Sequence, residues 1–306
     1  MNSDEPPSAS IPRSPNAPSP ETLAKWIKDL RDQAKPQPMY TPPLVTATYV
    51  LHYDCTVWLS AGHDFPVCTS DAVKNTANLW INDALFLEEF KIRKDKIQIL
   101  FRARPDVSPV VFASRIKGRL QHTLRTMGYP LKFSRKVSFR CLGDNISAAV
   151  VGYLKKQVRK EGFVDPSFAA NMEKFTVVRD DVNLAEPCKT VRGRYWYNLH
   201  LVLVVEGRVQ LGRMKSLEIL RDGCLRIAKS KGYQLKSVSV MLEHIHIALR
   251  GIPEQSPQDI ALAFMNNLAW IMGRNRIWQN GYYVGTFSEY SLSNLPFQRH
   301  KVVGDV

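Results

Sequence analysis

Two histidines in an alternating stretch are the first candidates for chemistry. Residues 237–249 read SVSVMLEHIHIAL, which predicts a single β-strand with Ile245 and Ile247 facing a core. His244 and His246 then share the opposite face, with side chains about 7 Å apart, and two imidazoles so placed can bind one metal ion. The alternative is a pair of hydrogen-bonded surface histidines, because an isolated H-x-H in a strand is a weak motif.

A tyrosine and a glutamine four residues apart are the second candidate. Residues 145–162 read NISAAVVGYLKKQVRKEG, which predicts a helix that ends at Gly162. Its apolar stripe consists of Val150, Leu154 and Val158. Tyr153 and Gln157 lie one turn apart beside that stripe, so they share a helix face. The basic residues around them are Lys155, Lys156, Arg159 and Lys160. Taken alone, the pattern also fits a surface tyrosine on a basic helix.

An internal repeat indicates which elements carry these residues. Residues 95–109 recur as residues 243–257, an offset of 148, with six of fifteen positions identical where chance gives about one. The same offset aligns Tyr49, Leu51 and His52 with Tyr197, Leu199 and His200, in predicted opening strands. Each copy reads strand, helix, strand and a helix that begins after Ser-Pro. The chain is therefore predicted to be α+β, with helices on a largely antiparallel sheet in each of two tandem copies.

The repeat also divides the chain into parts. We predict a tail at residues 1–39, copy one at 40–162, a connector at 163–190 and copy two at 191–306. Six prolines among residues 6–20 predict that the tail is disordered. A short amphipathic helix is predicted in its second part from Leu23, Trp26, Ile27 and Leu30.

The two copies keep different halves of the candidate site. Copy one has Lys96 and Gln98 where copy two has its histidines, and neither replaces an imidazole ligand. Copy two has Gln298 and Val302 opposite the tyrosine and the glutamine, and Pro296 opposes a helix there. Histidines from one copy and a tyrosine from the other would complete a single site.

These residues resemble the single-tyrosine HUH transposases of single-strand insertion sequences and their REP-associated relatives. The resemblance rests on residues 244–246 (HIH), 153–157 (YLKKQ) and 278–282 (WQNGY). It implies two tandem ferredoxin-like HUH domains that form an intramolecular pseudo-dimer. By resemblance, the ligands of a Mg²⁺ or Mn²⁺ ion would be His244, His246 and Gln157, and the nucleophile would be Tyr153.

The implied activity is metal-dependent nicking and strand transfer of single-stranded DNA through a 5′-phosphotyrosine intermediate. A divalent cation offsets the phosphodiester charge that repels nucleophiles, and a phenol with a pKa of about 10 can attack and be retained covalently. The alternative is a domesticated, catalytically silent protein that binds hairpins or single-stranded DNA as a regulator or as a targeting partner for another nuclease. A replication or conjugation initiator with the same chemistry stays open.

Net charge also indicates a nucleic-acid partner. Lys and Arg number 42 against 28 Asp and Glu, a net charge of +14. Residues 1–39 hold five basic and five acidic residues, so the excess lies beyond them. The predicted DNA-binding residues are Arg102, Arg115, Lys117, Arg119, Lys155, Lys156, Arg250, Arg274, Arg276 and Trp278. A basic surface that only confers solubility is the alternative, and homo-oligomer formation stays open.

Other features bear on the compartment. The five cysteines are odd in number and scattered, which predicts reduced, mostly buried side chains. The longest apolar runs, such as residues 199–205, are far shorter than the roughly 20 residues of a membrane helix. No secretory h-region is seen near the start. We therefore expect a cytoplasmic protein, associated with the nucleoid.

Overall fold

Strands with alternating burial form two sheets in the part of the chain that the structure describes. The computed structural model describes residues 19, 21–22, 25, 38–191, 193–273 and 276–289. Sheet A has the strand order β1-β12-β9-β11-β10-β6, and sheet B has the order β3-β4-β2-β5-β8-β7. The strands are β1 (Thr46–Val50), β2 (His52–Leu59), β3 (Leu85–Ile92), β4 (Lys96–Ala103), β5 (Phe133–Leu142), β6 (Thr176–Val178), β7 (Cys188–Lys189), β8 (Gly193–Trp196), β9 (Asn198–Val205), β10 (Gln234–Val240), β11 (His244–Arg250) and β12 (Trp278–Thr286).

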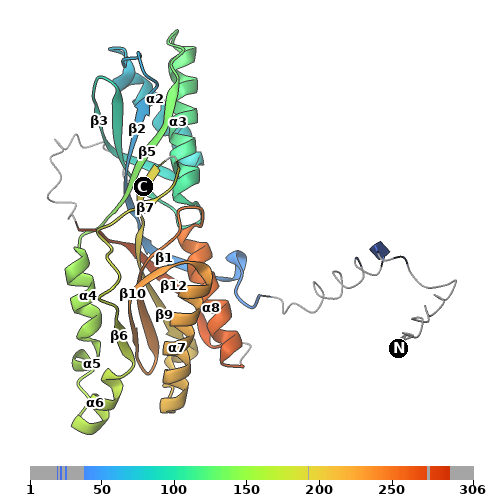
Figure 1. Cartoon of the computed structure of the whole chain (residues 1–306), viewed down its shortest axis with the longest axis vertical. Coiled ribbons are helices and arrows are strands. Elements are labelled where there is room, and N and C mark those ends of the chain that lie inside the picture. The colour runs from blue at the N-terminus through green and yellow to red at the C-terminus, as the bar shows by residue number, and fades with distance from the viewer. Residues whose placement is uncertain are drawn as a thin grey trace, which may run out of the picture. The chain divides into compact units, whose positions relative to one another are not determined.

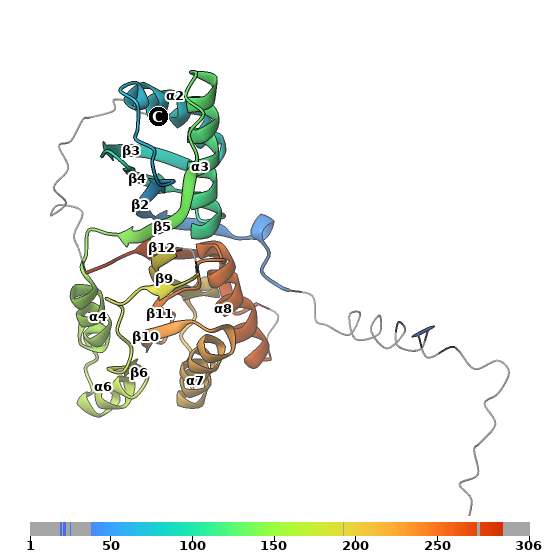
Figure 2. The same cartoon turned by 45° about the horizontal axis from the view of Figure 1, so that its top comes forward.

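Helices cover these sheets. They are α2 (Thr69–Asn82), α3 (Pro109–Thr126), α4 (Ser147–Lys155), α5 (Gln157–Lys160), α6 (Pro166–Glu173), α7 (Met214–Lys231) and α8 (Pro257–Ile271), with 3₁₀ turns η1 (Pro42–Leu44) and η2 (Glu206–Arg208). Helices α2 and α3 lie on one face of sheet B (Figure 1). Helices α7 and α8 cover one face of sheet A, and α4 to α6 lie on its opposite face (Figure 2). No described helix has the length and apolar character needed to span a bilayer.

Four strands of each sheet follow the same order. Strands β3-β4-β2-β5 of sheet B correspond in sequence order to β10-β11-β9-β12 of sheet A. The α+β class is confirmed, but each sheet is mixed, because β1 pairs in parallel with β12 and β8 pairs in parallel with β5. Both of these strands precede the first strand of one half and pair with the last strand of the other half. We call this arrangement the strand exchange.

Residues 1–38 and residues 39–306 form two separate compact units. The predicted proline-rich tail and amphipathic helix lie outside the described residues, apart from residues 19, 21, 22 and 25. Everything described below belongs to the unit that begins at Met39.

The predicted single strand at residues 237–249 is wrong in one respect. The chain turns back between β10 and β11, and the amide of Met241 donates to the carbonyl of His244 at 2.8 Å. The two strands then pair antiparallel, with Ser239 opposite His246. Ile245 and Ile247 are buried in the core as predicted.

The predicted helix over residues 145–162 is also interrupted. Lys156, with φ −96° and ψ 2°, separates α4 from the single turn of α5. The N-cap residue is Ile146, which offers no capping side chain, and Gly162 follows α5 with a φ of +62°. The predicted apolar stripe is buried at all three positions, Val150, Leu154 and Val158. A packed stripe therefore holds this segment in place across the break.

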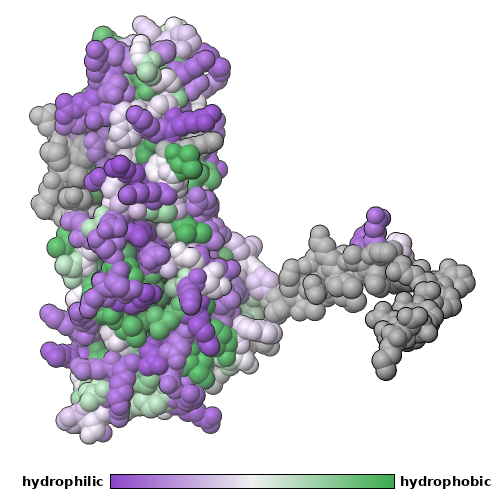
Figure 3. Space-filling view, in the orientation of Figure 1, coloured by the Kyte–Doolittle hydropathy of each residue, from purple (hydrophilic) through white to green (hydrophobic). Residues whose placement is uncertain are grey.

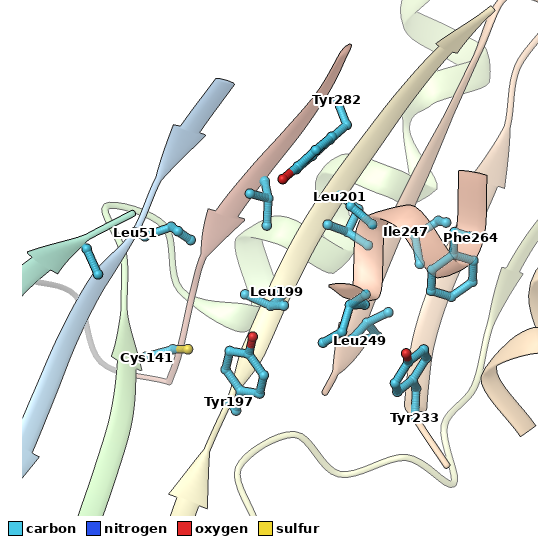
Figure 4. Close-up of a cluster of buried hydrophobic side chains, with 14 of the residues drawn as sticks. Leu51, Cys141, Tyr197, Leu199, Leu201, Tyr233, Ile247, Leu249, Phe264 and Tyr282 are labelled. Atoms are coloured by element: carbon cyan, nitrogen blue, oxygen red, sulfur yellow. The ribbon is translucent and has the colours of Figure 1, made fainter. Parts of the chain in front are cut away.

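One continuous core joins the two sheets. Leu51 and Cys141, from the first half of the chain, belong to the same buried cluster as Tyr197, Leu199 and Ile247 from the second half (Figure 4). The five cysteines are all free thiols, and Cys55, Cys141 and Cys224 are buried. The prediction of mostly buried cysteines is confirmed.

Gly143 lies where the chain leaves sheet B for α4, and it is expected to tolerate no side chain. A Cβ atom there would collide with the backbone carbonyl oxygen of Thr286 and lie 3.1 Å from the Cα of Phe287. We expect Gly143→Ala to lower the free energy of unfolding by about 1–3 kcal/mol, because backbone cannot move aside as a side chain can. Chemical denaturation measures this change.

The matched control is Gly152→Ala, inside α4. Nothing lies within 4 Å of a Cβ atom at that position. The substitution should raise stability by about 0.5–1 kcal/mol, because glycine loses more backbone entropy than alanine in a helix. Equal effects of the two substitutions would contradict the close approach at Gly143.

Candidate active site

Strand β11 places two imidazoles on the face of sheet A that α4 covers. His244 and His246 point away from the core side of the strand, and their ring centroids lie 4.9 Å apart. His246 is buried, with 5% of its surface exposed, and His244 is half-buried. Strand alternation therefore produces the predicted pair on one face.

Helix α4 is held against the same face by a small apolar cluster. Val150 and Leu154 pack there with Ala248 of β11 and with Phe287. The amide of Ser147 donates to the carbonyl of Ser288 at 2.8 Å, which joins the start of α4 to the end of β12. Tyr153, the next residue before Leu154, is thereby brought over the histidines.

The tyrosine and the histidines meet in the structure. The ring of Tyr153 lies 5.4 Å from that of His246, centroid to centroid, in an edge-to-face arrangement. The Nζ atom of Lys160 lies 3.8 Å from the centroid of the Tyr153 ring, a cation–π contact. Tyr153 keeps 39% of its surface exposed, so a ligand can reach it.

Gln157 lies under the tyrosine, with 3% of its surface exposed. Its amide nitrogen donates to the main-chain carbonyl of Tyr153 at 3.2 Å. The side-chain oxygen is the atom of this group that remains to act as a metal ligand. Among the described residues, no group of three or more His, Cys, Asp or Glu side chains is placed to hold a metal ion.

A third histidine, missed as a site residue, lies beside the pair. His200 of β9 has its Nε2 atom 3.1 Å from Nδ1 of His246. Its ring also lies 6.3 Å from the Tyr153 ring and 5.9 Å from the Tyr283 ring, centroid to centroid. The internal repeat aligned His200 with His52, but His52 contacts Glu88 instead, at 3.1 Å, so the alignment carried no signal of a site.

Burial keeps these imidazoles neutral. Burial lowers the pKa of His200 to about 4. Burial, followed by the neighbouring charges of His200, His244 and Lys160, lowers the pKa of His246 to about 2. Burial also lowers the pKa of His244, against the opposing effect of Glu161 and Glu243. Neutral imidazoles have lone pairs with which to bind a metal ion.

These lowered pKa values predict a loss of stability in mild acid. Unfolded histidine has a pKa of about 6.5, so between that pH and about 4 the unfolded chain binds protons that folded His200 and His246 do not. Stability should be full above about pH 6.5 and should fall below it, by about 2 kcal/mol per histidine at pH 5. Urea denaturation at pH 7.5 and pH 5 measures the change.

A variant that lacks one of these imidazoles gives the control. His246→Asn should reduce the dependence of stability on pH between 7.5 and 5, since one buried group no longer resists protonation. An unchanged dependence in this variant would contradict the assignment of the effect to the site.

Several predicted DNA-binding arginines have partners within the protein. Arg102 pairs with Glu88 at 3.1 Å. Arg119 and Arg115 both contact Asp83, at 2.9 and 3.7 Å. These arginine side chains are exposed enough to reach DNA. Contact with a DNA phosphate would, however, compete with the ion pair that each arginine makes with its carboxylate.

Two further predicted cations bind main-chain carbonyls. Nζ of Lys117 donates to Ser134 at 2.8 Å, and Nη1 of Arg250 donates to Asn183 at 3.2 Å. Lys155, Lys156 and Arg276 are exposed, and Arg274 lies outside the described residues. Figure 3 shows that one face of the molecule mixes hydrophilic side chains with hydrophobic ones. Lys155 and Lys156, at the end of α4 and at its C-cap, follow Tyr153 closely in the chain.

Trp278 is the clear correction. The sequence placed it among the DNA-binding residues, but its side chain is fully buried. Its indole N–H donates to the carbonyl of Met265 at 3.1 Å. Trp278 is therefore a core residue of sheet A, because its large apolar ring stabilises the packing of β12 on α8.

One family model matches part of the second half of the chain. Residues 194–296 match the family model "Transposase IS200 like". This match includes the histidine pair and lies outside the segment that carries Tyr153. No curated protein matches the chain.

Three solved structures are similar to parts of the chain. A putative transposase from Deinococcus radiodurans R1 is 23% identical over 30% of this chain and 79% of its own, with a TM-score of 0.28. A REP-associated tyrosine transposase bound to a REP hairpin is 13% identical over 31% and 58%, with a TM-score of 0.26. A protein of unknown function from Galdieria sulphuraria is 10% identical over 78% and 97%, with a TM-score of 0.19.

Proposed function

We propose that the chain nicks single-stranded DNA and transfers the cut strand through a 5′-phosphotyrosine, because residues 194–296 match the family model "Transposase IS200 like". The observation that carries the proposal is the approach of Tyr153 to His246, with ring centroids 5.4 Å apart. The family match contains the histidines only, so the tyrosine comes from the other half of the chain. The first half of the chain would thus supply the nucleophile, and the second half would supply the histidine ligands of the metal ion.

We further propose that the two halves are tandem HUH-like copies that act as an intramolecular pseudo-dimer. The shared order of four strands and the reciprocal strand exchange support this reading. One composite site would survive. Copy one has Lys96 and Gln98 in place of the histidine pair, and the counterparts of the tyrosine helix, Gln298 and Val302, lie outside the described residues.

The donor set fits a divalent cation. His244 and His246 offer neutral imidazoles and Gln157 offers an amide oxygen, a mixed set that accepts Mg²⁺ or Mn²⁺. When bound, such an ion supplies Lewis-acid stabilisation of the charge on the attacked phosphate. Strand β11 carries the two histidines and α5 carries the glutamine, and rigid elements of this kind suit a metal site.

The side chains of this protein perform the remaining steps. The phenol oxygen of Tyr153 attacks phosphorus, its proton is lost to solvent, and the 3′-oxygen leaves and takes up a proton. The 5′-phosphate stays on the tyrosine until a 3′-hydroxyl of another strand attacks it and releases the phenol. Lys160, whose ammonium lies 3.8 Å from the centroid of the tyrosine ring, would stabilise negative charge on the attacked phosphate.

The proposed substrate is single-stranded DNA, and a hairpin next to the cleavage position is the form we favour. Lys155 and Lys156 expose positive charge beside Tyr153, and phosphates bind there by counterion release. We propose that the protein acts on cellular DNA in the cytoplasm, in association with the nucleoid. Homo-oligomers and a partner nuclease stay open.

The test is capture of the covalent intermediate. The full chain is incubated with Mn²⁺ and a library of hairpin-bearing single-stranded oligonucleotides labelled at the 3′ end, and denaturing gels report the labelled protein. We expect a protein–DNA adduct that forms with Mn²⁺ and does not form when EDTA is present from the start. Tight binding that ignores EDTA, without an adduct for any sequence, would favour the second candidate, a catalytically silent DNA-binding protein. The lost histidine pair of copy one is the observation that favours that candidate.

A further inference from the structure

The contact between His200 and His246 is an in-plane hydrogen bond. The two nitrogens lie 3.1 Å apart, the ring planes differ by only 19°, and the centroids lie 5.3 Å apart. The distance between the centroids exceeds the distance between the nitrogens by about twice the distance from the centre of an imidazole to one of its nitrogens. Both nitrogens must therefore lie near the line that joins the two centroids. The rings therefore meet edge to edge, as N–H···N geometry demands.

Such a bond holds one proton, and its position decides what His246 can do. If His200 donates from Nε2, then His246 in its neutral form carries its own proton on its other nitrogen and has no lone pair left for a metal ion. If His246 donates from Nδ1, its Nε2 lone pair is available. The two arrangements differ only in the direction of one hydrogen bond.

We propose that His200 is a positioning residue that accepts the Nδ1–H of His246 and so presents Nε2 of His246 to the divalent cation. The inference rests on the proposed function and extends it to a residue on a third element, β9. A hydrogen bond to the second ring nitrogen is a general way to orient a ligating imidazole.

The surroundings of His200 fix its ring for this task. Its partners on the neighbouring strands are Ala248, which has only a methyl side chain, and Gly285, which has none. The rings of Tyr153 and Tyr283 then approach it edge-on. Since Nε2 of His200 is occupied by His246, the same nitrogen does not also bind the cation.

The test separates hydrogen bonding from packing with two substitutions. His200→Phe keeps an aromatic ring without an acceptor, and His200→Gln places an amide oxygen near the position of Nε2. Mn²⁺ affinity is measured by electron paramagnetic resonance of the free ion. We expect His200→Phe to weaken Mn²⁺ binding by about 10- to 100-fold, and His200→Gln to recover most of that loss.

A second readout needs no metal. Long-range ¹⁵N–¹H correlation spectra of ¹⁵N-histidine-labelled protein report which nitrogen of His246 carries the proton. We expect Nδ1–H in the unchanged protein and a mixture of tautomers in His200→Phe. His52→Phe, at the aligned position in the first half, is the matched control and should leave both readouts unchanged.

Four outcomes would overturn the proposal. A proton on Nε2 of His246, or equal Mn²⁺ affinity of His200→Phe and the unchanged protein, removes the positioning role alone. A third coordinated imidazole in the Mn²⁺ electron spin-echo spectrum makes His200 a ligand instead. Absence of Mn²⁺ binding by the unchanged protein overturns the proposed metal site, and the positioning role fails with it.

Discussion

Tyr153→Phe is expected to abolish covalent attachment to DNA, with a loss of about 10⁴-fold or more in the rate of adduct formation. Removing the phenol oxygen leaves no atom to form the bond to phosphorus, while the phenyl ring keeps its contacts with His246 and Lys160. Hairpin binding should change little, since the Tyr153 hydroxyl makes no hydrogen bond to another residue within the described part of the chain. Adduct yield on denaturing gels and binding by fluorescence anisotropy separate these two effects.

Tyr49 supplies the matched control. It is as exposed as Tyr153, at 40% against 39%, and it lies on β1 at the edge of the same sheet. Tyr49→Phe should leave adduct formation unchanged. An adduct that persists in Tyr153→Phe and vanishes in Tyr49→Phe would move the nucleophile to the other tyrosine and overturn the composite site.

The second large effect is expected at the histidine pair. His244→Ala and His246→Ala should each weaken Mn²⁺ binding by more than about 100-fold, because loss of an outer-shell partner alone costs 10- to 100-fold. Adduct formation should fall in parallel, and raising the Mn²⁺ concentration should restore part of it. Titration calorimetry with Mn²⁺ and the adduct assay measure the two quantities.

His122, exposed on α3, is the control for this pair. His122→Ala should bind Mn²⁺ as the unchanged protein does. Persistent adduct formation in the two site variants, independent of metal, would contradict the proposed role of the imidazoles. If the variants bind hairpins normally and the unchanged protein never forms an adduct, the silent DNA-binding protein becomes the better account.

Periodicity predicted the elements of the site because burial follows local spacing. The stripe of Val150, Leu154 and Val158 is buried as expected, and strand alternation places His244 and His246 on one face. The four-residue spacing of these apolar side chains did not reveal that the helix is interrupted at Lys156. The break leaves the stripe buried, so apolar spacing does not register it.

Contacts between distant strands were beyond such patterns. The alternation changes phase here, because the apolar positions move from Val238 and Val240 to Ile245 and Ile247. The prediction of a single strand passed over this change, which marks the turn that separates β10 from β11. Trp278 follows a basic stretch that suggested a surface, yet its ring fills the core. The partnership of His200 with His246 depends on the pairing of β9 with β11, which only the folded sheet defines.

The strand exchange has a consequence for dividing the molecule. A fragment that ends before β8 would leave the outer side of β5 without its partner, and a fragment that starts after β1 would do the same to β12. Bare strand edges pair with one another, so each fragment made alone should self-associate into insoluble material. Mixing the fragments after synthesis would then have to compete with that aggregation. Because both halves belong to one chain, each molecule always contains one of each half. A pair of separate subunits that dissociates freely does not ensure this.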